Sequence, residues 1–88
     1  MSLNQFRNEA GSFLAHWDHD LWDALEEEFE LLKKSVDDAD AFRHQVYDML
    51  YLLFEMASKF DMDLDMEWER GRKKKEKYGW NVLWHTMK

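Results

Sequence analysis

The sequence predicts an all-α fold of four main helices, on the basis of three observations. The 88 residues contain no proline and only three glycines, and strong helix formers run through most of the chain. Apolar residues recur at intervals of three and four, which is the spacing of one helical face. The segment 42–60 is apolar on nearly every side, which indicates a central helix covered by neighbours on more than one face.

The first two expected helices cover residues 3–17 and about 20–36. Asp18 or Asp20 is expected to cap the second of these, because a side-chain oxygen at that position accepts from free backbone N–H groups. Lys33 and Lys34 lie near its end, where they suit the negative end of the helix dipole. Its expected core stripe consists of Leu21, Leu25, Phe29, Leu32 and Val36.

The last two expected helices run from about Ala39 to Phe60 and from about Leu64 to Lys77. Residues 35–40 have the turn and capping residues typical of a short connection. Residues 61–65 break the apolar pattern and supply a new cap, but they lack the glycine and glutamate of an EF-hand loop, which excludes that calcium motif. Gly79 is expected to end the fourth helix, before a short aromatic tail. The expected buried stripe of the third helix consists of Val46, Leu50, Leu53, Ala57 and Phe60.

Length and composition predict one domain covering residues 1–88. A chain this short buries a modest share of its surface, yet it carries 16% aromatic residues and six methionines. We therefore expect the helical bundle to be completed by oligomerisation. The absence of cysteine excludes disulfides and thiolate metal sites, and no apolar run is long enough to cross a bilayer. A cytoplasmic protein with no membrane partner is expected.

The charges are distributed unevenly along the chain. The net charge is −7, and 17 of the 19 acidic residues lie between Asp18 and Glu69. Six of the 12 basic residues lie between Arg70 and Lys77. An acidic body argues against a nucleic-acid partner, because affinity for a phosphate backbone rests on basic surface. It is compatible with divalent cations, and the basic segment either faces phosphates or pairs with the acidic body.

Acidic residues at helical spacing form a candidate magnesium site. Glu27 and Glu30 on the second helix are neighbours at i, i+3, and Gln45 and Asp48 on the third helix have the same spacing. Two antiparallel helices that bring such oxygen ligands to one level of a bundle make a site that magnesium prefers. The alternative is an ordinary solvated acidic face. His16 and His19 are likewise either transition-metal ligands or polar residues around a helix junction.

The order of these features resembles the MazG-like family of all-α nucleoside triphosphate pyrophosphohydrolases. A glutamate-rich helix, a turn and an apolar helix with a central aspartate are followed by D-x-D-L-x-x-x-W-x-x-G-R-x-K-x-x-K-Y-G. The resemblance covers roughly residues 18–79. It implies a core of four helices built between subunits, hence a homodimer or homotetramer. It also implies magnesium-dependent hydrolysis of a nucleoside triphosphate to the monophosphate and pyrophosphate.

The resemblance implies a set of ligands as well. Glu27, Glu30 and Asp48 match family positions that hold Mg²⁺, which activates the attacking water. Gln45 stands at the fourth position, where the family has a glutamate, and contributes no charge.

A second register of the glutamate cluster stays open. It matches Glu27-Glu28-Phe29 to the family pattern, aligns the apolar positions better, and places Leu31 at a ligand position. Glu28 also lies nearer the core stripe than Glu27 does. Three of four ligands survive in the first register and two in the second.

Contacts to the substrate follow from the same resemblance. Three basic residues of the fourth helix are candidates for phosphate contacts, or form a solvated or acid-paired face: Arg72, Lys74 and Lys77. Three aromatic residues either line a base pocket or belong to the core: Trp22, Tyr47 and Tyr51. His44, one turn before Asp48, is a candidate to orient that carboxylate.

Three functions therefore stay open. The leading hypothesis is a magnesium-dependent nucleotide pyrophosphohydrolase. The second is a non-catalytic relative that keeps the fold as a nucleotide-binding or oligomerisation module, and Gln45 favours it. The third is a plain helical interaction protein, which predicts no stabilisation by divalent ions and no pocket bearing Asp48.

Overall fold

The computed structural model describes residues 2–14 and 20–78, and in these ranges it shows four helices and no strand. The helices are α1 (Leu3–Leu14), α2 (Leu21–Lys34), α3 (Ala39–Lys59) and α4 (Leu64–Tyr78). The predicted all-α class is confirmed, and the last three helices lie close to their expected ranges. His16 and His19, the end of the first expected helix and the aromatic tail lie outside the described residues. Within the described ranges, no helix has the length and apolarity needed to span a membrane.

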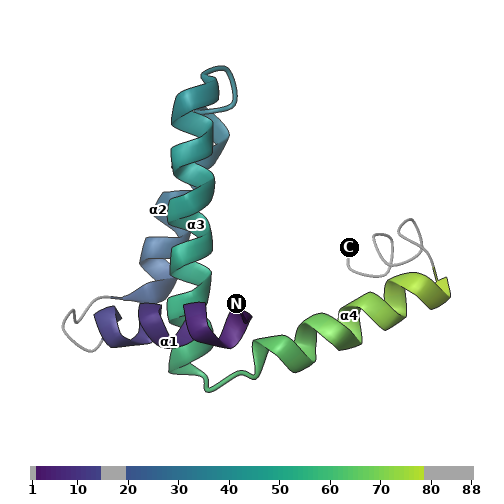
Figure 1. Cartoon of the computed structure of the whole chain (residues 1–88). Coiled ribbons are helices and arrows are strands. Elements are labelled where there is room, and N and C mark those ends of the chain that lie inside the picture. The colour runs from purple at the N-terminus through teal and green to yellow at the C-terminus, as the bar shows by residue number, and fades with distance from the viewer. Residues whose placement is uncertain (1, 15–19, 79–88) are drawn as a thin grey trace.

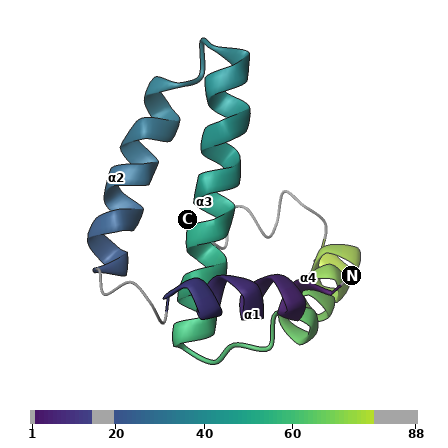
Figure 2. The ribbon, with the colours of Figure 1, turned by 60° about the vertical axis from the view of Figure 1, so that its left-hand side comes forward.

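The helices α2 and α3 form an antiparallel hairpin, and α1 crosses α3 near the carboxyl end of α3 (Figures 1 and 2). The hairpin helices begin at aspartate caps, as their sequences predict. Asp20 Oδ1 accepts hydrogen bonds from the backbone N–H groups of Trp22 at 2.9 Å and Asp23 at 3.2 Å. Asp38 caps α3 in the same way. These bonds satisfy backbone donors that have no partner within the helix.

The core of the hairpin lies between α2 and the carboxyl half of α3. Leu21 from α2 packs with Leu52 and Met56 from α3, and Ala24 and Leu25 pack against this cluster. These residues are two turns or less apart on each helix, so they share one face of α2 and one face of α3. These residues form a short apolar seam between α2 and α3, and the polar side chains of the hairpin lie beside this seam.

The crossing of α1 over α3 depends on a glycine. A Cβ atom built on Gly11 would lie 2.0 Å from Ser58 Oγ and 2.8 Å from Ser58 Cβ. Real side chains do not approach one another so closely, so only glycine allows the two helix backbones this separation. Ala10, the preceding residue, is buried at the same crossing.

The expected core stripe of α3 is wrong for the single chain. Ala57 is buried, but the other four members of the stripe are exposed: Val46, Leu50, Leu53 and Phe60. Instead, α2 covers the face that carries Leu52 and Met56, and α1 contacts Tyr51, Phe54 and Ser58. Because α3 is apolar on nearly every side, periodicity alone did not select the face that the neighbours cover. In α2, Phe29 and Val36 are likewise exposed.

The amino ends of α1 and α4 cap one another. Asp65 Oδ1 accepts from the backbone N–H of Leu3 at 2.9 Å, and Asp65 Oδ2 accepts from that of Asn4 at 3.4 Å. In return, Asn4 Oδ1 accepts from the backbone N–H of Leu64 at 2.8 Å, and Asn4 Nδ2 donates to Asp63 Oδ1 at 3.0 Å. The bond from Asn4 is the main cause that lowers the pKa of Asp63 below its ordinary value. This junction fixes α4 to α1.

Replacing Asn4 by alanine is expected to lower the free energy of unfolding by about 1 kcal/mol, the usual loss when a helix cap is removed. The substitution takes away the acceptor for Leu64 N–H and the donor to Asp63. Urea unfolding followed by circular dichroism measures the loss. Asn8→Ala is the matched control, because Asn8 is exposed and its side chain accepts from Arg7. Equal losses in the two variants would contradict a capping role for Asn4.

Candidate functional site

The amide of Gln45 joins α3 to α2. Gln45 is buried, and its Nε2 donates to the backbone carbonyl of Glu28 at 3.1 Å and to the Glu28 carboxylate. A glutamine provides two N–H donors here, whereas a glutamate would place a second negative charge beside Glu28. The bond turns the Glu28 side chain toward α3, so Glu28 is the member of the glutamate cluster that reaches the neighbouring helix.

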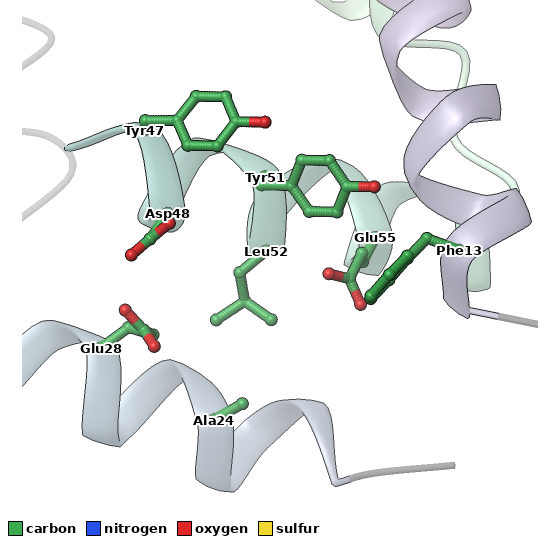
Figure 3. Close-up of a pocket in the computed structure, with 8 residues that line it drawn as sticks. All are labelled: Phe13, Ala24, Glu28, Tyr47, Asp48, Tyr51, Leu52 and Glu55. Atoms are coloured by element: carbon green, nitrogen blue, oxygen red, sulfur yellow. The ribbon is translucent and has the colours of Figure 1, made fainter. Parts of the chain in front are cut away.

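A cleft of about 590 Å³ lies where α1, α2 and α3 meet, and we call it the carboxylate cleft. Figure 3 shows the Glu28 and Asp48 carboxylates pointing toward one another across the gap between α2 and α3. A third carboxylate, that of Glu55, lies deeper along α3 beside the ring of Phe13. The cleft is lined by Phe13, Ala24, Glu28, Tyr47, Asp48, Tyr51, Leu52 and Glu55.

Asp48 lies in this cleft. His44 lies one turn before it, and His44 Nε2 is 3.4 Å from Asp48 Oδ2. The expected contact between His44 and Asp48 is therefore present. Most of the His44 side chain is exposed to solvent, so the pair forms at the rim of the cleft.

Glu27 and Glu30 lie outside the carboxylate cleft. Glu27 is exposed on α2. Glu30 forms an ion pair with Lys33 at 2.9 Å, and a hydrogen bond from Lys33, followed by its charge, lowers the pKa of Glu30. The single chain therefore brings Asp48 together with Glu28, and not with the two glutamates that the resemblance implies. As ligands, Glu27 and Glu30 stay predictions.

The basic residues of α4 are distant from the cleft in the fold. The helix α4 packs against α1 at its amino end and then leads away from the hairpin (Figure 1). Arg72 forms an ion pair with Glu69 of the same helix. Arg72, Lys74 and Lys77 are exposed, and none of the three lines the carboxylate cleft. Their contact with substrate phosphates stays a prediction.

A second hollow, the apolar groove, runs along the other side of the hairpin and measures about 760 Å³. Its floor is formed by apolar side chains of both helices, and Glu26 and Glu30 lie at its edge. Trp22 lines it and is 59% exposed, and Phe29 lines it and is 50% exposed. Trp22 thus belongs to this groove and not to the aromatic wall formed by Tyr47 and Tyr51.

Two carboxylates of the cleft stand outside the predicted ligand set of the first register: Glu28, which only the second register includes, and Glu55. Glu28 follows Ala24 by four positions and Leu21 by seven, so it continues the buried face of α2. Glu55 precedes Met56 and is buried, which is unusual for a glutamate. Their helical position relative to the residues that the structure shows to be buried identifies both. Spacing within the glutamate cluster alone does not.

The donor set of the cleft suits magnesium bound together with phosphates. In the ranges 2–14 and 20–78, no three histidine, aspartate or glutamate side chains gather closely enough to hold a metal ion between them. Two facing carboxylates from Glu28 and Asp48 are nevertheless hard oxygen ligands. Magnesium commonly takes one or two carboxylates and fills its other positions with water and substrate phosphates. The residues present fit such a site better than a cage built wholly of protein ligands.

Comparison of the chain with protein-family models, with curated proteins and with solved structures finds no match.

Proposed function

We propose that the chain is a magnesium-dependent nucleoside triphosphate pyrophosphohydrolase whose site is the carboxylate cleft. One observation carries the proposal: Glu28 and Asp48 face one another in a cleft that also has an aromatic wall. Two like charges in one partly enclosed space repel, and a divalent cation would relieve that repulsion. The wall gives a nucleobase a surface to stack on. The resemblance to the MazG-like family, which matches Asp48 to a position that holds Mg²⁺, supports the same activity.

In this proposal each residue has a defined task. Glu28 and Asp48 hold the cation and thereby orient the phosphates. Bound magnesium supplies charge neutralisation for the phosphates and activation of the attacking water. Gln45 positions the Glu28 carboxylate by donating to it, and His44 restrains Asp48 at the rim. Tyr47 and Tyr51 form the wall against which the base lies. The products are a nucleoside monophosphate and pyrophosphate.

A homodimer completes the bundle in this proposal. The single chain leaves many large apolar side chains exposed, and a patch of this kind usually marks an interface. The apolar groove, with Trp22, Phe29 and Leu53, is the surface where a second copy would bury most. Because α4 leads away from its own hairpin, a second copy is also the means by which its basic residues would reach phosphates in a cleft.

Pyrophosphate release by two matched variants tests the site. Glu28→Gln removes the carboxylate that faces Asp48, and we expect it to lower magnesium-dependent release by about 10²-fold or more. Glu30→Gln removes a carboxylate that pairs with Lys33 outside the cleft, and we expect nearly full activity. The reverse pattern would favour the register in which Glu27 and Glu30 are ligands. No release by the parent chain with any nucleoside triphosphate would overturn the enzymatic proposal.

A second candidate function is a non-catalytic nucleotide-binding or oligomerisation module, and the Gln45 contact favours it. A structural bond holds Gln45 against Glu28, so the amide serves packing between α2 and α3. Gln45→Glu discriminates the two. If the variant gains magnesium-dependent activity that the parent lacks, the native chain is the non-catalytic form. If the parent is active and the variant is not improved, the glutamine is part of a working site.

A further inference from the structure

The carboxylate cleft has two chemically different ends. At one end, Glu28 and Asp48 face one another near the rim. At the other end lies Glu55, which is only 6% exposed and stands beside the ring of Phe13. Asp48 and Glu55 are seven positions apart on α3, which corresponds to two helical turns and about 10 Å. The cleft therefore presents carboxylate oxygen at two levels rather than in one cluster.

Three aromatic rings lie between and around these ends. The ring centroids of Tyr47 and Tyr51 are 6.1 Å apart, and those of Phe13 and Tyr51 are 5.9 Å apart with an interplanar angle of 85°. This arrangement offers ring faces and edges to a flat ligand. Burial, followed by the nearby charge of Glu55, raises the pKa of the Tyr51 phenol, so this phenol stays uncharged near neutral pH.

The separation of the two ends matches the shape of a nucleotide. With its phosphates at Glu28 and Asp48, a nucleotide would extend its sugar and base along α3 toward the rings. The edge of the base would then meet Glu55. A carboxylate accepts hydrogen bonds and does not donate them. Cytosine and adenine present an exocyclic amino donor, whereas uracil presents a carbonyl oxygen at the corresponding position, as thymine does.

Building on the proposed nucleotide site, we propose that Glu55 determines base specificity by accepting a hydrogen bond from the exocyclic amino group of the substrate base. The cleft then selects amino-bearing bases over their keto counterparts. A keto base would place its carbonyl oxygen against the Glu55 carboxylate, leaving two buried acceptors facing one another without a proton between them. Sites built to bind an N–H group reject analogues that lack it far more strongly than apolar pockets reject a missing methylene.

Binding of matched nucleotides to the full chain tests this proposal. Isothermal calorimetry with magnesium and α,β-imido analogues compares dCTP with dUTP, and dATP with dITP; each pair differs by an amino-to-keto change. We expect the amino member of both pairs to bind about 10²-fold more tightly or better. In Glu55→Gln, whose amide both donates and accepts, the ratio should fall close to one while binding persists. Asp37→Asn, which changes an exposed carboxylate in the turn between α2 and α3, is the control and should keep the ratio.

The possible results distinguish base selection by Glu55 from the proposed nucleotide site on which it rests. Equal affinity within both pairs, with binding lost in Asp48→Asn, would overturn base selection by Glu55 and leave the nucleotide site intact. A preference for the keto members would overturn it as well, because Glu55 would then accept from the ring N–H that these bases carry beside the carbonyl group and not from an amino group. Binding of none of the four analogues would overturn both proposals. If Glu55→Gln does not fold, the affinity ratios of wild type within the two nucleotide pairs still test the proposal.

Discussion

Replacing Leu21 by alanine is expected to lower the free energy of unfolding by about 2–5 kcal/mol, the range for removing a buried leucine side chain. Leu21 is 2% exposed and packs with Leu52 and Met56 at the centre of the hairpin. Domains of this kind are stabilised by roughly 5–15 kcal/mol in total. The substitution therefore removes a large share of the stability, and urea unfolding measures it as a shift of the midpoint.

Leu31→Ala is the matched control for this prediction. It makes the same chemical change on the same helix, but Leu31 is 45% exposed. Its loss should stay below about 1 kcal/mol, because the side chain is already largely in water and leaves no cavity. Both measurements are made at low protein concentration, where association contributes little. Equal losses would contradict the assignment of the core to the seam between α2 and α3.

The second large effect on the free energy of unfolding is expected for Gly11→Ala. Alanine at a helical position usually stabilises by about 1 kcal/mol relative to glycine. At Gly11 the added methyl group would meet Ser58 Oγ and Ser58 Cβ, so the helices must separate at a cost of about 1–3 kcal/mol. We expect Gly11→Ala to be destabilising on balance. In a Ser58→Gly background both obstructing atoms are absent, and the same substitution should become stabilising by about 1 kcal/mol.

Gly71 supplies the control for Gly11. It also lies in a helix, and a Cβ built on it would have no heavy atom within 4 Å. Gly71→Ala is therefore expected to raise the free energy of unfolding by about 1 kcal/mol. Opposite signs at the two glycines, measured by thermal unfolding, would establish the tight crossing of α1 and α3. Stabilisation at both would refute it.

The helices could be predicted from the sequence because their signals are local. Asp20 and Asp38 cap α2 and α3 through hydrogen bonds within three residues, and the apolar spacing inside each helix does not depend on its neighbours. The junction of α1 with α4 could not be predicted. It joins Asn4 to Asp63 and Asp65, about sixty residues away, and no pattern in the sequence links these positions.

The candidate site was predictable in part for the same reason. Asp48 lies in the middle of an apolar helix and the next acid, Glu55, follows two turns later, so the position of Asp48 is informative without a partner. The glutamates of α2 are consecutive, and a shift of one residue turns a side chain by about 100° around the helix. Only the packing of Leu21 and the bond from Gln45 select Glu28. Glu55 became a candidate once the structure showed that it is buried.

The central claim is that magnesium and a nucleoside triphosphate bind at Asp48. Thermal unfolding of the chain with magnesium and a mixture of the four α,β-imido deoxynucleoside triphosphates tests it most directly. The comparison is between wild type, Asp48→Asn and the control Asp40→Asn, which changes an exposed aspartate of α3 that pairs with Arg43.

We expect the ligands to stabilise wild type by about 2.7 kcal/mol at a hundredfold excess over the dissociation constant. Asp40→Asn should keep this rise in the unfolding midpoint, and Asp48→Asn should lose it. An unchanged midpoint in wild type, or an equal rise in Asp48→Asn, would contradict the claim.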